Sequence, residues 1–137
     1  MTVKSFRDLG VWQAGMELVE RTYLLTRDLP SNETYGLTSQ MRRAAVSVPS
    51  NIAEGHARQH TKECLHHLSI AQASLAELET QFEIAARLSY FSSESVQPVL
   101  DQIVSLGRQL SALRKVSLTR GPGRGRGLGI GSGRTED

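Results

Sequence analysis

The chain has 137 residues, a formal net charge of +2 and a single cysteine, Cys64. Its length suits one domain, one cysteine excludes an internal disulfide, and no apolar run approaches the roughly 18 residues of a membrane span. Aromatic residues make up 5% of the chain, which disfavours a β-sandwich. We expect a helical cytoplasmic protein, since the first residues form no apolar signal core.

The first predicted helix begins after Asp8, its expected N-cap, and ends before Pro30. Its apolar residues recur at spacings of three and four, which is typical of a helix that packs against others: Leu9, Trp12, Met16, Val19 and Tyr23. We expect this stripe to face the core. A second apolar row predicts either a wide core or, as we favour, self-association: Val11, Ala14, Leu18 and Leu25.

The second predicted helix has a proline inside its apolar stripe, which is formed by Leu37, Met41, Ala44, Val48 and Ile52. Pro49 removes one backbone hydrogen bond. Because the stripe continues past it, we expect one kinked helix rather than a break. Gly55 is the expected left-handed C-cap.

Two further stripes predict the third and fourth helices. The third comprises Cys64, Leu68, Ala71, Leu75, Leu78, Phe82 and Ala85, and the fourth Val96, Val99, Ile103, Leu106, Leu110 and Leu113. Ser93 is the expected N-cap of the fourth, and Pro98 lies near its first turn. Because the connections are short, we expect an all-α, antiparallel up-down-up-down four-helix bundle over residues 1–116.

Residues 117–137 form a different kind of segment, in which glycines alternate with other residues. This tail carries four arginines and two acidic residues, which leaves residues 1–116 with no net charge. It lacks the apolar residues to offset chain entropy, so we expect disorder. The tail is either an arm that contacts phosphates or an extension without a role.

A polar row runs along the second predicted helix opposite its apolar stripe: Gln40, Arg43, Ser47, Asn51, Glu54 and Arg58. Such a row is either a solvated face with ion pairs or a surface for a subunit or ligand. The pattern alone favours the solvated face.

The same helix carries a recognisable motif. Residues 35–55, YGLTSQMRRAAVSVPSNIAEG, resemble the signature of the small proteins encoded in intervening sequences of 23S rRNA genes. The opening segment FRDLGVW and the third-helix segment LSIAQASLAELET resemble the same family. The resemblance covers about residues 5–114.

This resemblance implies a four-helix bundle without catalytic activity. The same superfamily includes the accessory variability determinant proteins of diversity-generating retroelements, which form ring-shaped homopentamers and bind nucleic acid and a reverse transcriptase. It therefore implies a homopentamer whose partner is DNA, RNA, a reverse transcriptase or another protein. The positions that match the signature are Gln40, Arg43, Ser47, Pro49, Asn51, Glu54, Gly55, Ser74 and Glu77. We expect structural or intersubunit polar contacts from five of them: Arg43, Ser47, Asn51, Glu54 and Glu77.

The predicted topology gathers basic residues at one end of the bundle. The start of the first helix, the turn after the second and the end of the fourth meet there. Our candidates for nucleic-acid binding are Lys4, Arg7, Arg58, Lys62, Arg114 and Lys115, with four histidines nearby, His56, His60, His66 and His67. Such an end binds phosphates with strong salt dependence. The alternative is an end partly neutralised by Asp8, Glu54 and Glu63.

Metal binding and catalysis receive weaker support. His60, Cys64 and His67 share one helical face and are zinc-type ligands, with His56 and Glu63 close by. Cys64, however, falls in the core stripe, and a Cys64–His60 nucleophile pair lacks an orienting third group. We expect no metal, cofactor or catalytic residue. The leading hypothesis is a non-enzymatic oligomer that binds nucleic acid or a nucleic-acid enzyme, and the alternative is a protein–protein adaptor.

Overall fold

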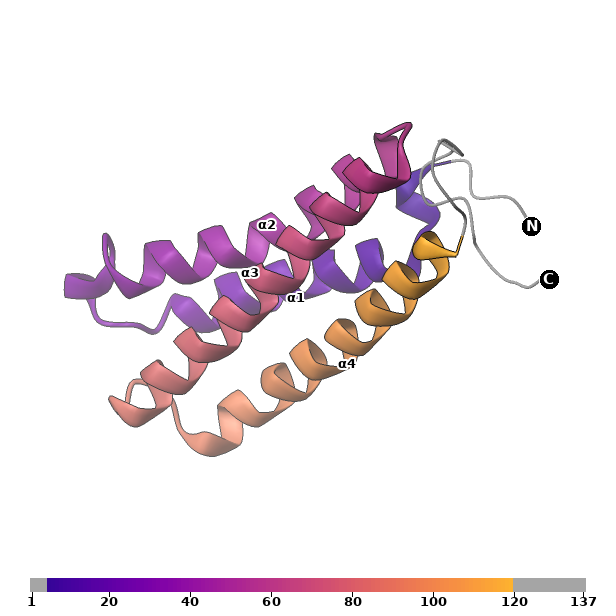
Figure 1. Ribbon diagram of the computed structural model, residues 1–137. Helices are drawn as coiled ribbons and strands as arrows, with labels where there is room; N and C mark the ends of the chain where they lie inside the picture. Colours follow the sequence, from indigo (N-terminus) through magenta and orange to yellow (C-terminus); the bar gives the residue numbers. More distant parts are fainter. Residues whose placement is uncertain (1–4, 120–137) are drawn as a thin grey trace.

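The computed structural model describes residues 5–119, and these form an all-α bundle of four long helices (Figure 1). Successive helices run in opposite directions and each packs against two neighbours, which confirms the predicted up-down arrangement. None of the described helices is long and apolar enough to cross a membrane. The elements are η1 (Phe6–Asp8), α1 (Gly10–Thr26), η2 (Ser31–Glu33), α2 (Leu37–Ala57), α3 (Thr61–Arg87) and α4 (Ser93–Leu118).

Apolar stripes of α2, α3 and α4 form the core as predicted. Their largest fully buried side chains are Met41, Val48, Ile52, Leu68, Leu78, Phe82, Val96, Val99, Leu106 and Leu110. Each stripe recurs every three or four residues, so it stays on one side of its helix over several turns. The bundle is therefore held together mainly by burial of aliphatic surface.

The prediction for α1 is confirmed only in part. Leu9 is buried, and Trp12 and Val19 pack against the core as predicted, but the second apolar row supplies the rest of the core contact. Val11 and Leu18 are buried, whereas Met16 and Tyr23, which we placed in the core, are each 40% exposed. The core face also contains glycine and threonine: Gly15, Thr22 and Thr26. Thr26 tolerates burial because its hydroxyl donates to the Thr22 carbonyl oxygen at 2.7 Å. The row that suggested self-association is thus largely core.

Pro49 lies inside α2 without interrupting it, since one helix runs from Leu37 to Ala57. This excludes a break and restart at the proline. Pro49 is buried against Gly15 of α1: a Cβ atom on that glycine would lie 3.3 Å from the proline Cβ. The proline ring therefore fills space that a larger residue on α1 would need.

Gly55 is not the C-cap of α2, which corrects the prediction. The helix continues to Ala57, and Arg58 is its C-cap in an extended conformation. A Cβ on Gly55 would lie 3.2 Å from the Cys64 carbonyl oxygen and 3.3 Å from the His67 Cβ. The glycine is needed because the first turns of α3 approach α2 closely there.

Two predicted N-caps are also wrong. Asp8 belongs to η1, and α1 begins after Leu9 without a side-chain cap. Ser92, rather than Ser93, caps α4, because its Oγ accepts a hydrogen bond from the Ser95 backbone N–H at 3.1 Å. Ser92 is extended, the usual conformation of an N-cap residue, whereas Ser93 is already helical.

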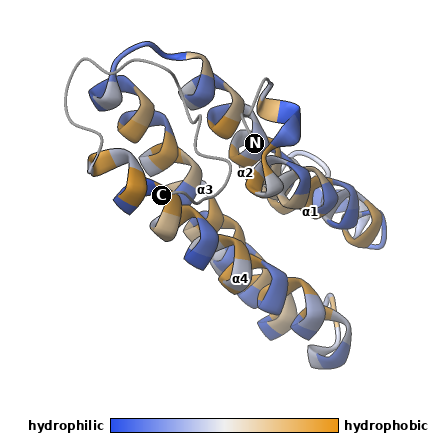
Figure 2. Cartoon of the chain, turned by 90° about the vertical axis from the view of Figure 1, so that its right-hand side faces the viewer, coloured by the Kyte–Doolittle hydropathy of each residue, from blue (hydrophilic) through white to orange (hydrophobic). Residues whose placement is uncertain are grey.

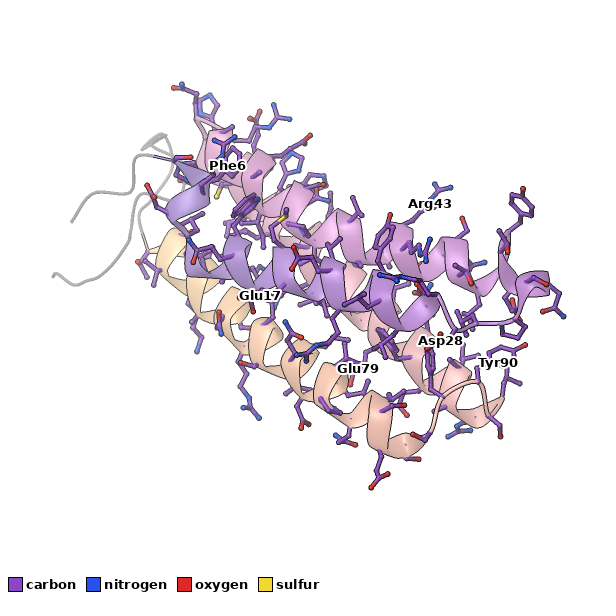
Figure 3. The ribbon with its side chains drawn as sticks, turned by 180° about the vertical axis from the view of Figure 1, so that it is seen from behind. Phe6, Glu17, Asp28, Arg43, Glu79 and Tyr90 are labelled. Atoms are coloured by element: carbon purple, nitrogen blue, oxygen red, sulfur yellow. The ribbon has the colours of Figure 1, made fainter. Side chains whose placement is uncertain are left out.

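Glu33 joins three segments at the end of the bundle opposite η1 and the last turn of α4. Its Oε1 accepts from the Leu37 N–H at 3.0 Å, and its Oε2 accepts from the Tyr90 hydroxyl at 2.8 Å. The bond from Leu37 and then that from Tyr90 lower the pKa of Glu33 below its usual 4.5. Tyr90 follows α3, and Figure 3 shows it at this end.

We predict that Glu33→Gln removes part of the acid sensitivity of the fold. A carboxyl with a lowered pKa stabilises the fold above its unfolded pKa and loses this effect as pH falls through the folded pKa. The stability difference between wild type and Glu33→Gln should therefore shrink below about pH 4.5. Melting temperatures of both proteins between pH 7 and pH 3 measure this, and a constant difference would contradict it.

Candidate nucleic-acid interface

One end of the bundle brings together η1, the connection between α2 and α3, and the last turns of α4 (Figure 1). Four exposed cationic side chains lie on these segments or in the first turn of α3: Arg7, Arg58, Lys62 and Lys115. We call these four residues the basic end. Figure 2 looks onto this side of the molecule and shows hydrophilic residues along the α2–α3 connection. Lys4, also predicted here, lies outside the described residues.

The cations of the basic end are only weakly engaged. Arg58 lies 3.6 Å from the Glu54 carboxylate, and both side chains are about half exposed. Such a surface pair is worth roughly 1 kcal/mol or less. The Arg7 guanidinium lies over the Phe6 ring, 4.7 Å from its centroid. Within residues 5–119, Lys62 and Lys115 have no ion pair within 4 Å. All four charges thus remain accessible to an anion.

His56 contributes little positive charge to this end. It is half-buried, and burial lowers its pKa below the usual 6.5, while the nearby Asp8 carboxylate opposes this shift. His56 is therefore mostly neutral at pH 7. His56 should therefore not be counted among the cations of this end.

Arg114 behaves differently from the other predicted cations. It is half-buried, and its Nη1 donates a hydrogen bond to Gln72 Oε1 across the α3–α4 contact. Its buried Nε has no partner among the described residues. Gln72 in turn donates from Nε2 to Ser111 Oγ at 2.8 Å. Periodicity did not single out Gln72 or Ser111, because neither belongs to a charged or apolar row.

Four polar side chains link α2 to α3, and we call them the α2–α3 ladder: Ser47, Asn51, His67 and Ser74. Ser74 donates its hydroxyl to Ser47 Oγ at 2.8 Å, and Asn51 Nδ2 donates to the Ser47 carbonyl oxygen at 2.9 Å. That bond fixes the Asn51 amide, so Oδ1 accepts from His67 Nδ1 at 3.0 Å. His67 Nδ1 therefore carries a proton.

Comparison with known proteins places the chain in a family. The model of the 23S rRNA-intervening sequence protein family matches residues 7–112. The chain belongs to this family. The match covers the described bundle almost completely, and the resemblance inferred from the α2 motif is therefore confirmed.

The fold is also similar to that of a protein of unknown function from Bacteroides thetaiotaomicron, which belongs to the S23 ribosomal protein family. The two structures have a TM-score of 0.71 and 23% sequence identity, over 77% of this chain and 98% of that chain. At this identity the match supports the fold alone. No curated protein matches the chain.

In this intervening-sequence protein the five expected polar-contact residues have different surroundings. Ser47 and Asn51 belong to the ladder, and Glu54 lies 3.5 Å from His67 Nδ1. Figure 3 shows Arg43 projecting from α2 away from the bundle. The exposed Glu77 accepts a long 3.4 Å bond from Gln81 within α3. Arg43, Glu54 and Glu77 are exposed, whereas Ser47 and Asn51 are half-buried and hydrogen-bonded in the contact between α2 and α3.

The candidate zinc ligands of the intervening-sequence protein are used in other ways. Cys64 is 3% exposed and lies in the core, whereas His60 is exposed and His67 bonds to Asn51. In residues 5–119 no group of three His, Cys, Asp or Glu side chains could hold a metal ion. Most of the Gly/Arg tail, from residue 120 on, lies outside the described residues, and α4 extends to Leu118.

Proposed function

We propose that this intervening-sequence protein is a non-enzymatic, self-associating bundle that binds nucleic acid, or an enzyme acting on nucleic acid, through its basic end. One observation carries the proposal: exposed cations from three separate segments meet at a single end of a bundle whose residues 1–116 have no net charge. Five cationic side chains, including Arg114, lie at this end together with three acidic ones: Asp8, Glu54 and Glu63. This end of the bundle therefore carries a local excess of positive charge.

Self-association would multiply this charge. Large apolar side chains remain exposed on α1, α2 and α3, among them Met16, Tyr23 and Leu24 of α1, Val46 of α2 and Ile84 of α3. Exposed apolar surface supports an interface between copies. The resemblance to ring-forming proteins favours a homopentamer, in which the basic end repeats around one rim. Several weak phosphate contacts per ring then add to useful affinity.

A role without catalysis fits the titratable groups whose pKa values shift. The bond from the Leu37 N–H and then that from Tyr90 lower the pKa of Glu33, and the bond to Glu33 raises the pKa of Tyr90, so both shifts belong to the fold. His56 is shifted chiefly by burial. An active site instead tends to combine such shifts with a cleft and a partner group. Each of these shifts has a structural cause.

Charge reversal of Arg58 and Lys62 tests the basic end. We expect Arg58→Glu with Lys62→Glu to weaken binding to fluorescent 20-nucleotide DNA or RNA by about 10- to 100-fold at 100 mM salt, with a shallower salt dependence. Fluorescence anisotropy measures affinity, and light scattering checks that the oligomer mass is unchanged. The matched control reverses Arg27 and Arg87, exposed arginines at the other end of the bundle. Equal losses in both double variants would refute the assignment.

The tail is tested by truncation, and the structure sets the cut. Ser117 is 3% exposed and α4 extends to Leu118, so a chain ending at Thr119 keeps the helix intact. Binding by both the full and the truncated chain would place the function on the bundle. Loss of binding on truncation would assign it to the four arginines of the tail.

A protein–protein adaptor is the second candidate, and the outer face of α1 favours it. Met16 and Tyr23 are each 40% exposed and Leu24 is 57% exposed, which is unusual for three large side chains on one short helix. This function predicts negligible affinity for DNA and RNA at 150 mM salt. It also predicts a specific partner that Met16→Ser with Tyr23→Ser releases, while the basic-end variants retain it.

A further inference from the structure

A groove runs between α3 and α4 and reaches the basic end. Gln72 of α3 faces a strip of α4 from Val104 to Lys115 across an open hollow of about 570 Å³. We call this hollow the α3–α4 groove. It exists because α4 has small residues there: a Cβ atom added to Gly107 would meet nothing within 4 Å. Lys115 belongs both to the groove and to the basic end.

The groove is lined by hydrogen-bond donors that lack acidic partners. Arg108 and Lys115 are exposed, and within residues 5–119 neither pairs with a carboxylate. They lie seven residues apart on α4, about 10 Å along the helix axis. Ser111 lies between them on the same side. Two cations with a hydroxyl between them form a row that suits an extended anion.

The donors at the centre of the groove are oriented in advance. Arg114 holds Gln72 Oε1, which turns Gln72 Nε2 toward Ser111 and the Gly107 carbonyl oxygen. Ser111 Oγ accepts that bond and donates none within residues 5–119. The hydroxyl proton is thus left to donate into the groove. Arg114 acts here as a positioning residue rather than as a direct ligand.

We propose that the α3–α4 groove binds the phosphate backbone of a nucleic acid, with Arg108 and Lys115 contacting separate phosphates and Ser111 lying between them. The inference rests on the proposed function and deepens it, because it gives the nucleic acid a path from the basic end along α4. A phosphodiester suits the site because it accepts hydrogen bonds on several oxygens and repeats along a strand. Continuity through Lys115 favours nucleic acid over an isolated small anion.

Two kinds of variant test the groove. Gly107→Leu places an apolar side chain in the hollow without changing any charge, and Gly10→Leu is its matched control, since a Cβ at Gly10 also meets nothing within 4 Å. Arg108→Gln with Lys115→Gln removes the cations, and Arg27→Gln with Arg87→Gln removes the same charge at the far end. Circular dichroism confirms folding, and anisotropy with a fluorescent 20-nucleotide single strand measures affinity at several salt concentrations.

We expect Gly107→Leu to weaken binding about 5-fold or more while Gly10→Leu leaves it unchanged. Arg108→Gln with Lys115→Gln should reduce the slope of log affinity against log salt by about 1.4, the loss of two phosphate contacts on a single strand. NMR should show inorganic phosphate shifting the Gln72 side-chain amide in wild type and not in Gly107→Leu.

The remaining outcomes separate the groove from the basic end. If Arg58→Glu with Lys62→Glu weakens binding but both groove variants bind as wild type, the proposed function stands and the groove assignment is wrong. If Arg108→Gln with Lys115→Gln weakens binding but Gly107→Leu does not, Arg108 and Lys115 act at a distance and the groove is unoccupied. If poly-glutamate displaces the strand from wild type but not from Gly107→Leu, the groove takes an acidic protein segment instead. If wild type binds no nucleic acid, both proposals fail.

Discussion

Asn51→Ala should lower the free energy of unfolding by about 2 kcal/mol, since it leaves several polar groups of a half-buried contact without partners. Asn51 donates from Nδ2 to the Ser47 carbonyl oxygen and Oγ and accepts from His67 Nδ1, at 2.9, 3.0 and 3.0 Å. Removing its amide breaks the middle of the α2–α3 ladder. The loss comes mainly from these hydrogen bonds, because Asn51→Ala removes the carboxamide and keeps the β-carbon.

Urea unfolding of wild type and variant measures this effect. Ser50→Ala is the matched control, because Ser50 is the exposed neighbour of Asn51 on the same helix and should change stability by less than about 0.5 kcal/mol. A double-mutant cycle with His67→Ala should give a coupling of about 1 kcal/mol. A coupling near zero would show that the hydrogen bond between Asn51 and His67 contributes nothing to the fold.

Sequence patterns located the ladder only in part. Ser47 and Asn51 stand one turn apart in the predicted polar row of α2, so their common face was visible. Their partners His67 and Ser74 come from α3. The spacing of residues within α2 does not tell which face of α3 packs against it. A solvated face was therefore the natural interpretation, although the structure has this part of the row between two helices.

The face of α1 illustrates a second limit. Periodicity counts apolar residues, and α1 has two apolar rows, of which the more regular one, with Met16 and Tyr23, is partly exposed. The core face uses Gly15, Thr22 and Thr26. Their small size or local hydrogen bonds allow burial, but a count of apolar residues leaves them out. On α2, α3 and α4 the core positions are mostly aliphatic, so the same count found them.

The basic end was predictable because it follows from topology. Four helices with short connections must alternate in direction, and alternation brings residues 7, 58, 62 and 115 to one end whatever the packing details. The α3–α4 groove was not predictable, because it depends on the absence of a side chain at Gly107 and on the bond from Arg114 to Gln72. Both are features of tertiary packing.

Gly15→Leu should destabilise the bundle by about 3 kcal/mol, the upper part of the usual range for overpacking a core. Gly15 is buried, and even a Cβ there would lie 3.3 and 3.5 Å from Cβ and Cδ of Pro49. The proline ring cannot rotate away as a flexible side chain could. The four-carbon side chain of leucine must therefore push α1 from α2, which disturbs the burial of Leu18 as well.

The matched control is Gly10→Leu, at an open position of the same helix, which should change stability by less than about 1 kcal/mol. Pro49→Ala supplies a second test, because it removes the ring and restores a backbone N–H inside α2. Gly15→Leu should cost clearly less in the Pro49→Ala background than in wild type, since the leucine then gains the vacated space. Equal costs in the two backgrounds, measured by urea unfolding, would mean that the contact between glycine and proline does not set the separation of α1 and α2.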